Sequence, residues 1–173
     1  MSAPDDATDQ QLADRVITAL VASGRRIAVA ESLTGGLLTA ALVGVPGASR
    51  ALLGGIVSYD TALKRTILGV DSAILAVHGA VHPDVARQMA LGVRQACAID
   101  GRPADVGVST TGAAGPDPQD GQRPGTAFVG LSVDGDSRAI ALHLEGDRQS
   151  VRAGVVHAAL VALVEALEPA GNI

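Results

Sequence analysis

The sequence predicts an α/β fold, a three-layer α/β/α single domain with a mixed sheet. Helical and strand patterns alternate along the 173 residues, and one hairpin signal interrupts the alternation. The chain is 47% hydrophobic but has one tyrosine, one phenylalanine and no tryptophan, so its core must consist of small aliphatic side chains. Such a core suits helices that pack in layers on a sheet, and the length fits one domain.

The domain boundaries follow from composition. We expect residues 1–9 to form a disordered leader, residues 10–168 to form the domain, and residues 169–173 to form a short tail. The leader is acidic and polar, the opposite of a secretory signal peptide.

Six segments carry the apolar spacing that favours helices. Gly24 ends the first helix, and Asp60 is a fair N-cap for the third. Pro83 opens the fifth helix, where the N–H group that proline lacks would have no helical partner in any case. The last helix has one apolar stripe, made of Val151, Val155, Ala159, Leu163 and Leu167. In chain order, the predicted helices are residues 10–23, 37–43, 61–68, 71–78, 83–98 and 147–167.

Five short runs of apolar and β-branched residues predict strands. Asp134-Gly135 lies between the last two and is a hairpin signal. Small residues and proline predict loops over residues 44–54 and 112–125. In chain order, the predicted strands are residues 27–30, 55–59, 105–111, 126–133 and 137–144.

Charge and composition exclude several classes of protein. The net charge of −5, without a basic run, does not favour nucleic acid or an anionic membrane as a partner. No apolar run reaches the roughly 20 residues that span a bilayer. We therefore expect a cytoplasmic protein. Cys97 is alone and fits a small core residue, and the four histidines (78, 82, 143 and 157) show no metal-binding spacing, so neither a metal nor another cofactor is expected.

The first polar cluster is Ser32-Leu33-Thr34-Gly35-Gly36, which follows a predicted strand and opens a helix. A serine there could present its hydroxyl beside unpaired N–H groups that suit a phosphate or a developing oxyanion. Alternatively, Ser32 or Thr34 only caps the helix. The segment matches neither a Walker A loop nor a Gly-x-Ser-x-Gly elbow.

The second cluster is Tyr59 with Lys64, the only lysine among thirteen basic residues. Unlike arginine, a lysine can lose its proton when it is buried. A neutral lysine can deprotonate a serine, and a tyrosine hydroxyl could relay the proton or hold the lysine. This role needs a lysine pKa well below the usual value of about 10.4. Alternatively, Lys64 is an accidental surface residue and Tyr59 a partly buried ring.

The third cluster combines residues 109–116 with Arg148 and Arg152. Hydroxyl groups and glycine N–H groups at a strand end can surround a phosphate. The two arginines are four residues apart, so they share a helix face and could bind an anion together. Alternatively, they pair with acidic neighbours such as Asp147.

Taken together, the motifs closely resemble the CinA C-terminal domain family, in the family's order, from about Gln10 to Leu167. The motifs that carry the resemblance are Ala30-Glu31-Ser32-Leu33-Thr34-Gly35-Gly36, Gly54-Gly55-Ile56-Val57-Ser58-Tyr59 with Lys64, Leu68-Gly69-Val70, His78-Gly79-Ala80-Val81, Thr111-Gly112-Ala113-Ala114-Gly115-Pro116, Pro124-Gly125-Thr126 and Gly146-Asp147-Arg148.

The resemblance implies an amidohydrolase that converts nicotinamide mononucleotide (NMN) to nicotinate mononucleotide and ammonia, in pyridine-nucleotide salvage. It implies Ser32 as nucleophile, Lys64 as general base and Tyr59 as the third member of the site. The N–H groups of Thr34, Gly35 and Gly36 are candidates for the oxyanion hole. The expected phosphate site consists of Thr111, Gly112, Gly115 and Arg148.

Three positions depart from the family pattern, which often has Cys at Leu33, Asn at Thr61 and Ser at His82. Thr61 and His82 motivate an alternative, a catalytically inactive nucleotide-binding or regulatory protein linked to competence and DNA damage. The chain has no room for the N-terminal domain of larger relatives, so a stand-alone deamidase is expected. A homo-oligomer is also expected, because the apolar helix 147–167 could pack against a copy.

Overall fold

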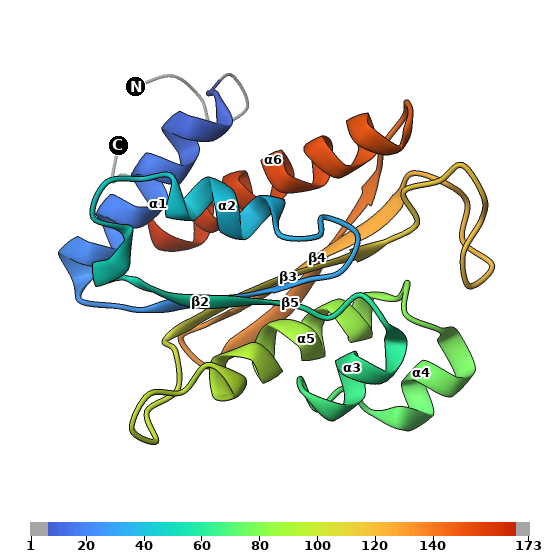
Figure 1. The fold of residues 1–173 in the computed structure, drawn as a ribbon, viewed down its shortest axis with the longest axis horizontal. Helices are drawn as coiled ribbons and strands as arrows, with labels where there is room; N and C mark the ends of the chain where they lie inside the picture. Colours follow the sequence, from blue (N-terminus) through green and yellow to red (C-terminus); the bar gives the residue numbers. More distant parts are fainter. Residues whose placement is uncertain (1–6, 169–173) are drawn as a thin grey trace.

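The computed structural model describes residues 7–168 and has the predicted α/β fold, with a five-stranded mixed sheet between two layers of helices (Figure 1). The strands lie in the order β2-β1-β3-β4-β5. β1 pairs in parallel with β2 and β3, whereas β3–β4 and β4–β5 are antiparallel. The strands are β1 (Ile27–Glu31), β2 (Leu52–Val57), β3 (Val106–Gly112), β4 (Thr126–Val133) and β5 (Asp136–His143).

The helices divide between the two faces of the sheet. One face carries α1 (Asp9–Ser23), α2 (Leu37–Val43) and α6 (Arg148–Leu167). The other carries α5 (Pro83–Ala96), with the short helices α3 (Thr61–Thr66) and α4 (Ser72–His78) beside it (Figure 1). The predicted helix starts at Asp60 and Pro83 and the hairpin at Asp134-Gly135 are confirmed.

The loop predicted over residues 44–54 was wrong in part. Ala48–Arg50 form a 3-10 helix, and β2 begins at Leu52 and ends at Val57, so Tyr59 lies beyond the strand. The proline and the small residues of 44–54 suggested a loop, but β2 starts within this segment. Gly55, which lay in the predicted strand, allows close packing against α2. A Cβ at Gly55 would stand 2.1 Å from the hydroxyl oxygen of Thr39.

The N-terminal boundary also differs from the prediction. Thr8 caps α1 through a capping box with Gln11, and Asp9 is the first helical residue. Three of the nine residues assigned to a leader are therefore described, and two of them shape the start of the domain. Residues 1–6 and the predicted tail, 169–173, lie outside the described part of the chain.

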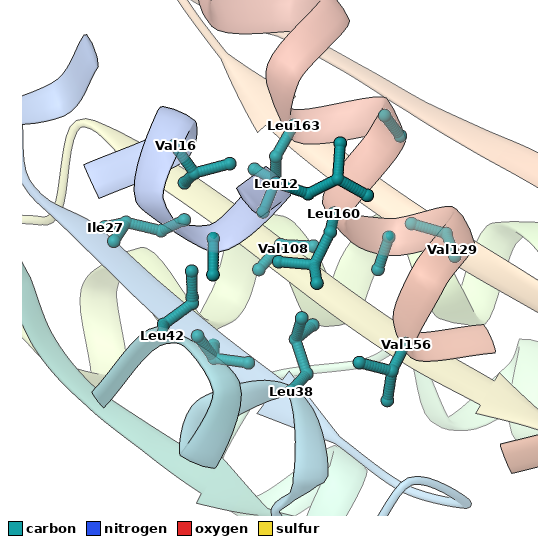
Figure 2. Close-up of a cluster of buried hydrophobic side chains, with 14 of the residues drawn as sticks. Leu12, Val16, Ile27, Leu38, Leu42, Val108, Val129, Val156, Leu160 and Leu163 are labelled. Atoms are coloured by element: carbon teal, nitrogen blue, oxygen red, sulfur yellow. The ribbon is translucent and has the colours of Figure 1, made fainter. Parts of the chain in front are cut away.

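The larger core lies between the sheet and the layer of α1, α2 and α6. Figure 2 shows that side chains from all three helices converge on residues from β1, β3 and β4. The cluster is almost wholly aliphatic, as the composition requires. Its labelled members are Leu12, Val16, Ile27, Leu38, Leu42, Val108, Val129, Val156, Leu160 and Leu163.

α6 is long and apolar enough to span a membrane by length and composition, but half of its most apolar stretch is buried in the fold. All five residues of the predicted stripe are buried. The helix packs against α1, α2, β3 and β4. The apolar stripe of this helix therefore packs inside one molecule.

The parallel strands bring their carboxyl ends to one edge of the sheet. Glu31 at the end of β1 lies beside Val57 of β2 and Thr110 of β3. Ligands of open α/β sheets bind outside this edge. Ser32, Tyr59 and the loop that follows Gly112 all emerge there.

Candidate active site

Lys64 and Ser32 meet at this edge although they are 32 residues apart. Ser32 follows β1 and is nearly buried, and Lys64 extends from α3. The Nζ atom of Lys64 donates a hydrogen bond to the Oγ atom of Ser32 over 3.0 Å. The two side chains are thus within the distance that direct proton transfer requires.

Lys64 is the largest fully buried side chain, with 1% of its surface exposed. Its Nζ also donates to the carbonyl oxygens of Ser58 (2.7 Å) and Tyr59 (3.3 Å). Burial lowers its pKa from 10.5 to about 8, while the carboxylates of Asp60 and Asp120 act in the opposite direction. The alternative of an accidental surface lysine is wrong.

This geometry suits a neutral lysine that acts as a base. A neutral amine has two hydrogens and one lone pair, and carbonyl oxygens can only accept hydrogen bonds. When Lys64 is neutral, its two hydrogens can satisfy the carbonyls of Ser58 and Tyr59. Its lone pair then faces the hydroxyl of Ser32, which becomes the donor.

Glu31, which the sequence interpretation did not single out, occupies the N-terminus of α2. Its fully buried carboxylate accepts from the N–H groups of Gly36 (3.0 Å), Leu38 (3.1 Å) and Thr39 (2.8 Å), and from the Thr39 hydroxyl (2.6 Å). A carboxylate is favoured at a helix N-terminus by the unpaired N–H groups and the helix dipole. This anion site is therefore filled by the protein itself.

The predicted oxyanion hole changes as a result. The N–H of Gly36 donates to Glu31, and that of Gly35 donates to the Ser32 carbonyl over 3.1 Å. Within residues 7–168, the N–H groups of Leu33 and Thr34 donate to no protein acceptor. Of the three N–H groups predicted to form the oxyanion hole, only that of Thr34 is available to a ligand. The N–H group of Leu33, which was not predicted, is available as well.

Arg152 holds this turn from α6. It donates through Nε to the carbonyl oxygen of Leu33 (2.8 Å) and through Nη2 to that of Thr34 (3.0 Å). Because C=O and N–H point in opposite directions in a trans peptide, the bond to Leu33 also fixes the direction of the Thr34 N–H. The sequence interpretation placed Arg152 near an anion, but its guanidinium binds backbone carbonyls.

Tyr59 presents its hydroxyl to Arg148 rather than to Lys64. Nη2 of Arg148 donates to the Tyr59 hydroxyl over 3.0 Å, and Nη1 donates to the carbonyl oxygen of Gly115 over 2.9 Å. Tyr59 is 61% exposed, which agrees with the alternative of a ring that is only partly buried. Its contact with the lysine is made by its backbone carbonyl.

Ser32 opens onto a small pocket with a volume near 70 Å³. Three of its lining residues, Ala114, Gln119 and Arg148, also line an outer groove of about 480 Å³ beside Gly115 and Pro116. The other residues of the inner pocket are Ser32, Leu33, Tyr59 and Gly112. The site is thus a narrow pocket that contains the serine and leads to a wider groove with Arg148 at the junction.

One predicted ligand of the phosphate does not face this space. Thr111 is buried, and its hydroxyl donates to the carbonyl oxygen of Ala80 over 2.7 Å. Thr34 is buried as well, and its hydroxyl bonds that of Thr110 over 2.7 Å. Both hydroxyls join neighbouring segments of the site instead of binding a ligand.

The three departures from the family pattern differ in position. Leu33 is buried and lines the pocket of Ser32. Thr61 is exposed at the start of α3 and lines a separate shallow depression. His82 caps α5 through Nδ1, which accepts from the Asp84 N–H, and its ring stacks on His78 at 4.3 Å. Only Leu33 therefore borders the serine.

The comparisons with known proteins agree on one family. The model of the CinA C-terminal domain matches residues 9–167. A CinA-like protein from Frankia casuarinae is 44% identical over 152 residues, which cover 88% of this chain and 34% of the relative. The chain spans about a third of the length of the curated relatives that it matches first.

Solved structures give the same result. A competence-damaged protein (CinA) superfamily protein from Klebsiella pneumoniae has a TM-score of 0.86 at 33% identity, with 93% of this chain and 98% of that chain covered. A competence or damage-inducible protein from Enterobacter asburiae has a TM-score of 0.88 at 29% identity, with 94% and 100% covered. The chain belongs to the CinA C-terminal domain family.

Proposed function

We propose that this protein hydrolyses the carboxamide of NMN to nicotinate mononucleotide and ammonia, with Ser32 as nucleophile and Lys64 as general base. The observation that carries the proposal is the buried Lys64 amine, 3.0 Å from the serine hydroxyl and with its pKa lowered to about 8. Burying a lysine costs stability, and perturbed groups of this kind concentrate at functional sites.

In the acylation step, neutral Lys64 takes the proton of the Ser32 hydroxyl while the oxygen attacks the carboxamide carbon. The negative charge that develops on the amide oxygen is stabilised by the N–H groups of Leu33 and Thr34. The protonated lysine then gives its proton to the departing amide nitrogen, the C–N bond breaks, and ammonia leaves. An ester between Ser32 and the nicotinate group remains.

In the deacylation step, Lys64 is neutral again and takes a proton from water, which attacks the ester carbon. The second tetrahedral intermediate collapses, the ester C–O bond breaks, and the proton returns to the Ser32 oxygen. The free carboxylic acid ionises in water. The same lysine therefore acts as base and acid in both halves of the reaction.

The nucleotide part of the substrate fits the outer groove in this proposal. Arg148 lies at the junction of pocket and groove, anchored by two bonds that leave other guanidinium hydrogens available for a phosphate. Gly112 lines the inner pocket and Gly115 lines the outer groove. Tyr59 would act by holding Arg148 through its hydroxyl and Lys64 through its carbonyl.

The first test is ammonia release from NMN by the purified protein and by Ser32→Ala. Loss of the nucleophile should reduce kcat by at least a factor of about 10³ while leaving the fold intact. Calorimetry should show that Ser32→Ala still binds NMN. Turnover at the normal rate in this variant would remove Ser32 from the mechanism.

Lys64→Arg tests the base separately. Arginine keeps the positive charge but does not become neutral in this pH range, so kcat should fall about as far as in Ser32→Ala. Because Lys64 is buried, the melting temperature of the variant is measured alongside its rate. Normal turnover by a folded Lys64→Arg protein would exclude the general-base role.

The alternative function, nucleotide binding without catalysis, was motivated by Thr61 and His82. Neither residue lines the pocket of Ser32, so these positions supply no argument for lost catalysis. The alternative makes a different prediction in the same assay. It would be supported if the wild-type protein bound NMN tightly and released no ammonia.

A further inference from the structure

The loop between β3 and β4, residues 113–125, contributes residues to both the serine pocket and the outer groove. At its base, the N–H of Gly125 donates to the carbonyl of Ala113 over 2.8 Å. At its tip, Gln119 and Gln122 exchange two backbone hydrogen bonds of 3.0 and 2.8 Å. Asp120 and Gly121 between them have positive φ angles of 53° and 73°, which make a tight turn. The tip is thus a defined structure.

Asp120 fastens this tip to the segment between α4 and α5. Its Oδ2 accepts from the N–H of Ala80 over 2.6 Å. A Cβ at Gly79 would lie 2.2 Å from Cγ of Asp120, so the carboxylate packs directly on this glycine. The carbonyl of Ala80 accepts from Thr111 on the other side. The tip and the end of β3 are therefore both attached to one residue, Ala80.

The attachment places Gln119 at the mouth of the serine pocket. Gln119 lines both the inner pocket with Ser32 and the outer groove with Arg148. Within residues 7–168, its side-chain amide makes no hydrogen bond, so its donor and acceptor atoms are available to a ligand. Gln119 immediately precedes Asp120, so the contact that holds Asp120 in place also restricts the position of the Gln119 backbone.

We infer that Gln119 binds the substrate's primary carboxamide and that Asp120 is a positioning residue that holds Gln119 there. The inference rests on the proposed function and adds a specificity determinant to it. A glutamine side chain has an acceptor oxygen and two donor hydrogens, and a substrate carboxamide has the complementary set. Its oxygen would accept from the leaving NH₂ group while the carbonyl oxygen of the substrate faces the N–H groups of Leu33 and Thr34.

The experiment measures NMN affinity by calorimetry in the Ser32→Ala background, where turnover cannot interfere, and KM and kcat in the wild-type background. Gln119→Ala should raise the Kd for NMN and the KM about tenfold, the size of one lost hydrogen bond to a buried ligand group. Asp120→Ala should do the same because it releases the tip. Asp120→Asn should restore the affinity, because its amide oxygen can still accept from Ala80.

Two control variants test whether the change in Kd is specific to Gln119. Gln122→Ala changes the residue opposite Gln119 but keeps the backbone bonds of the turn, so its Kd should equal that of the parent. The double variant Gln119→Ala/Asp120→Ala should bind no more weakly than either single variant, because Asp120 acts through Gln119. Additive losses, or an unchanged Kd in Gln119→Ala, would overturn the inference.

The outcomes separate this inference from the proposed function. If the wild-type protein hydrolyses NMN and Gln119→Ala has an unchanged Kd, the inference alone fails. If the folded wild-type protein neither binds nor hydrolyses NMN, the proposed function fails and the inference fails with it. If NMN binds without turnover, the calorimetric comparison still decides the role of Gln119.

Discussion

At the scale of single residues, the site depends on one lysine that is easier to deprotonate than usual. Burial lowers the pKa of Lys64 to about 8, whereas Asp60 and Asp120 limit the shift. These two carboxylates are the charged groups that act on it. If the neutral amine is the base, the active fraction of the enzyme grows as the pH approaches this pKa.

We therefore expect kcat/KM for NMN to rise about tenfold per pH unit below pH 8 and to level off above it. Rates measured from pH 6.5 upward avoid most of the titration of the substrate phosphate near pH 6. Asp120→Asn removes a carboxylate that raises the lysine pKa, so its inflection should move to lower pH. A rate that does not change between pH 6.5 and 9 would contradict a base with this pKa.

At the scale of elements, the start of α2 shows how a short helix is fixed beside Ser32, the proposed nucleophile. The buried carboxylate of Glu31 accepts three N–H groups and one hydroxyl, and it sits directly before Ser32. Arg152 holds the next two carbonyls of the same turn from α6. The turn that carries Ser32 is therefore attached to both the sheet and the helical layer.

Removal of the Glu31 carboxylate should be costly, because it leaves three N–H groups at the start of α2, one buried and two partly buried, without their acceptor. We expect Glu31→Ala to lower the free energy of unfolding by about 3 kcal/mol, measured by urea denaturation. Glu165→Ala, on the exposed side of α6, is the matched control and should change it by less than about 0.5 kcal/mol. Equal effects in the two variants would show that the helix start does not depend on Glu31.

At the scale of the whole molecule, the buried lysine links stability to function. The folded-state pKa of about 8 lies below the ordinary 10.5, so between these pH values the unfolded chain binds the proton more tightly. The free energy of unfolding should therefore rise with pH through this window, and the full cost of burying the charge is present below pH 8.

Lys64→Met keeps most of the side-chain volume and removes the charge. Its stability relative to the wild type should be about 2 kcal/mol greater at pH 7 than at pH 10, and turnover should be abolished, because at pH 7 the wild-type protein carries the cost of burying the charge. The comparison of two pH values cancels the loss of the hydrogen bonds that Nζ donates to the carbonyls of Ser58 and Tyr59, because methionine cannot make them at either pH. Urea denaturation at pH 7 and pH 10 measures the difference, and a relative stability that is the same at both pH values would contradict this account.

The homo-oligomer expected from the sequence stays a prediction. That expectation rested on the apolar composition of α6, whose stripe of five apolar residues is buried within one molecule. Light scattering of the purified protein would give the number of subunits in solution.

The sequence by itself determined the α/β fold and most element positions, and it singled out the residues of the candidate site. Its signals were local, such as the alternation of helix and strand, the cap at Asp60 and the proline that opens α5. The choice of Ser32 and Lys64 also came from the chain alone, through a resemblance to a family and the scarcity of lysine. The start of β2 was missed, because the proline and small residues of 44–54 suggest a loop, whereas Leu52 and Gly54 pair with residues of β1 that are distant in sequence.

Only the tertiary structure decided which groups meet. Lys64 reaches Ser32 across 32 residues, and Arg152 reaches Leu33 across 119. Glu31 fills the helix N-terminus that looked open for a ligand, and Thr111 turns its hydroxyl to Ala80. The physical reason is that hydrogen-bonding groups choose partners by distance in space after the layers have packed, whereas sequence signals extend over only a few neighbouring residues.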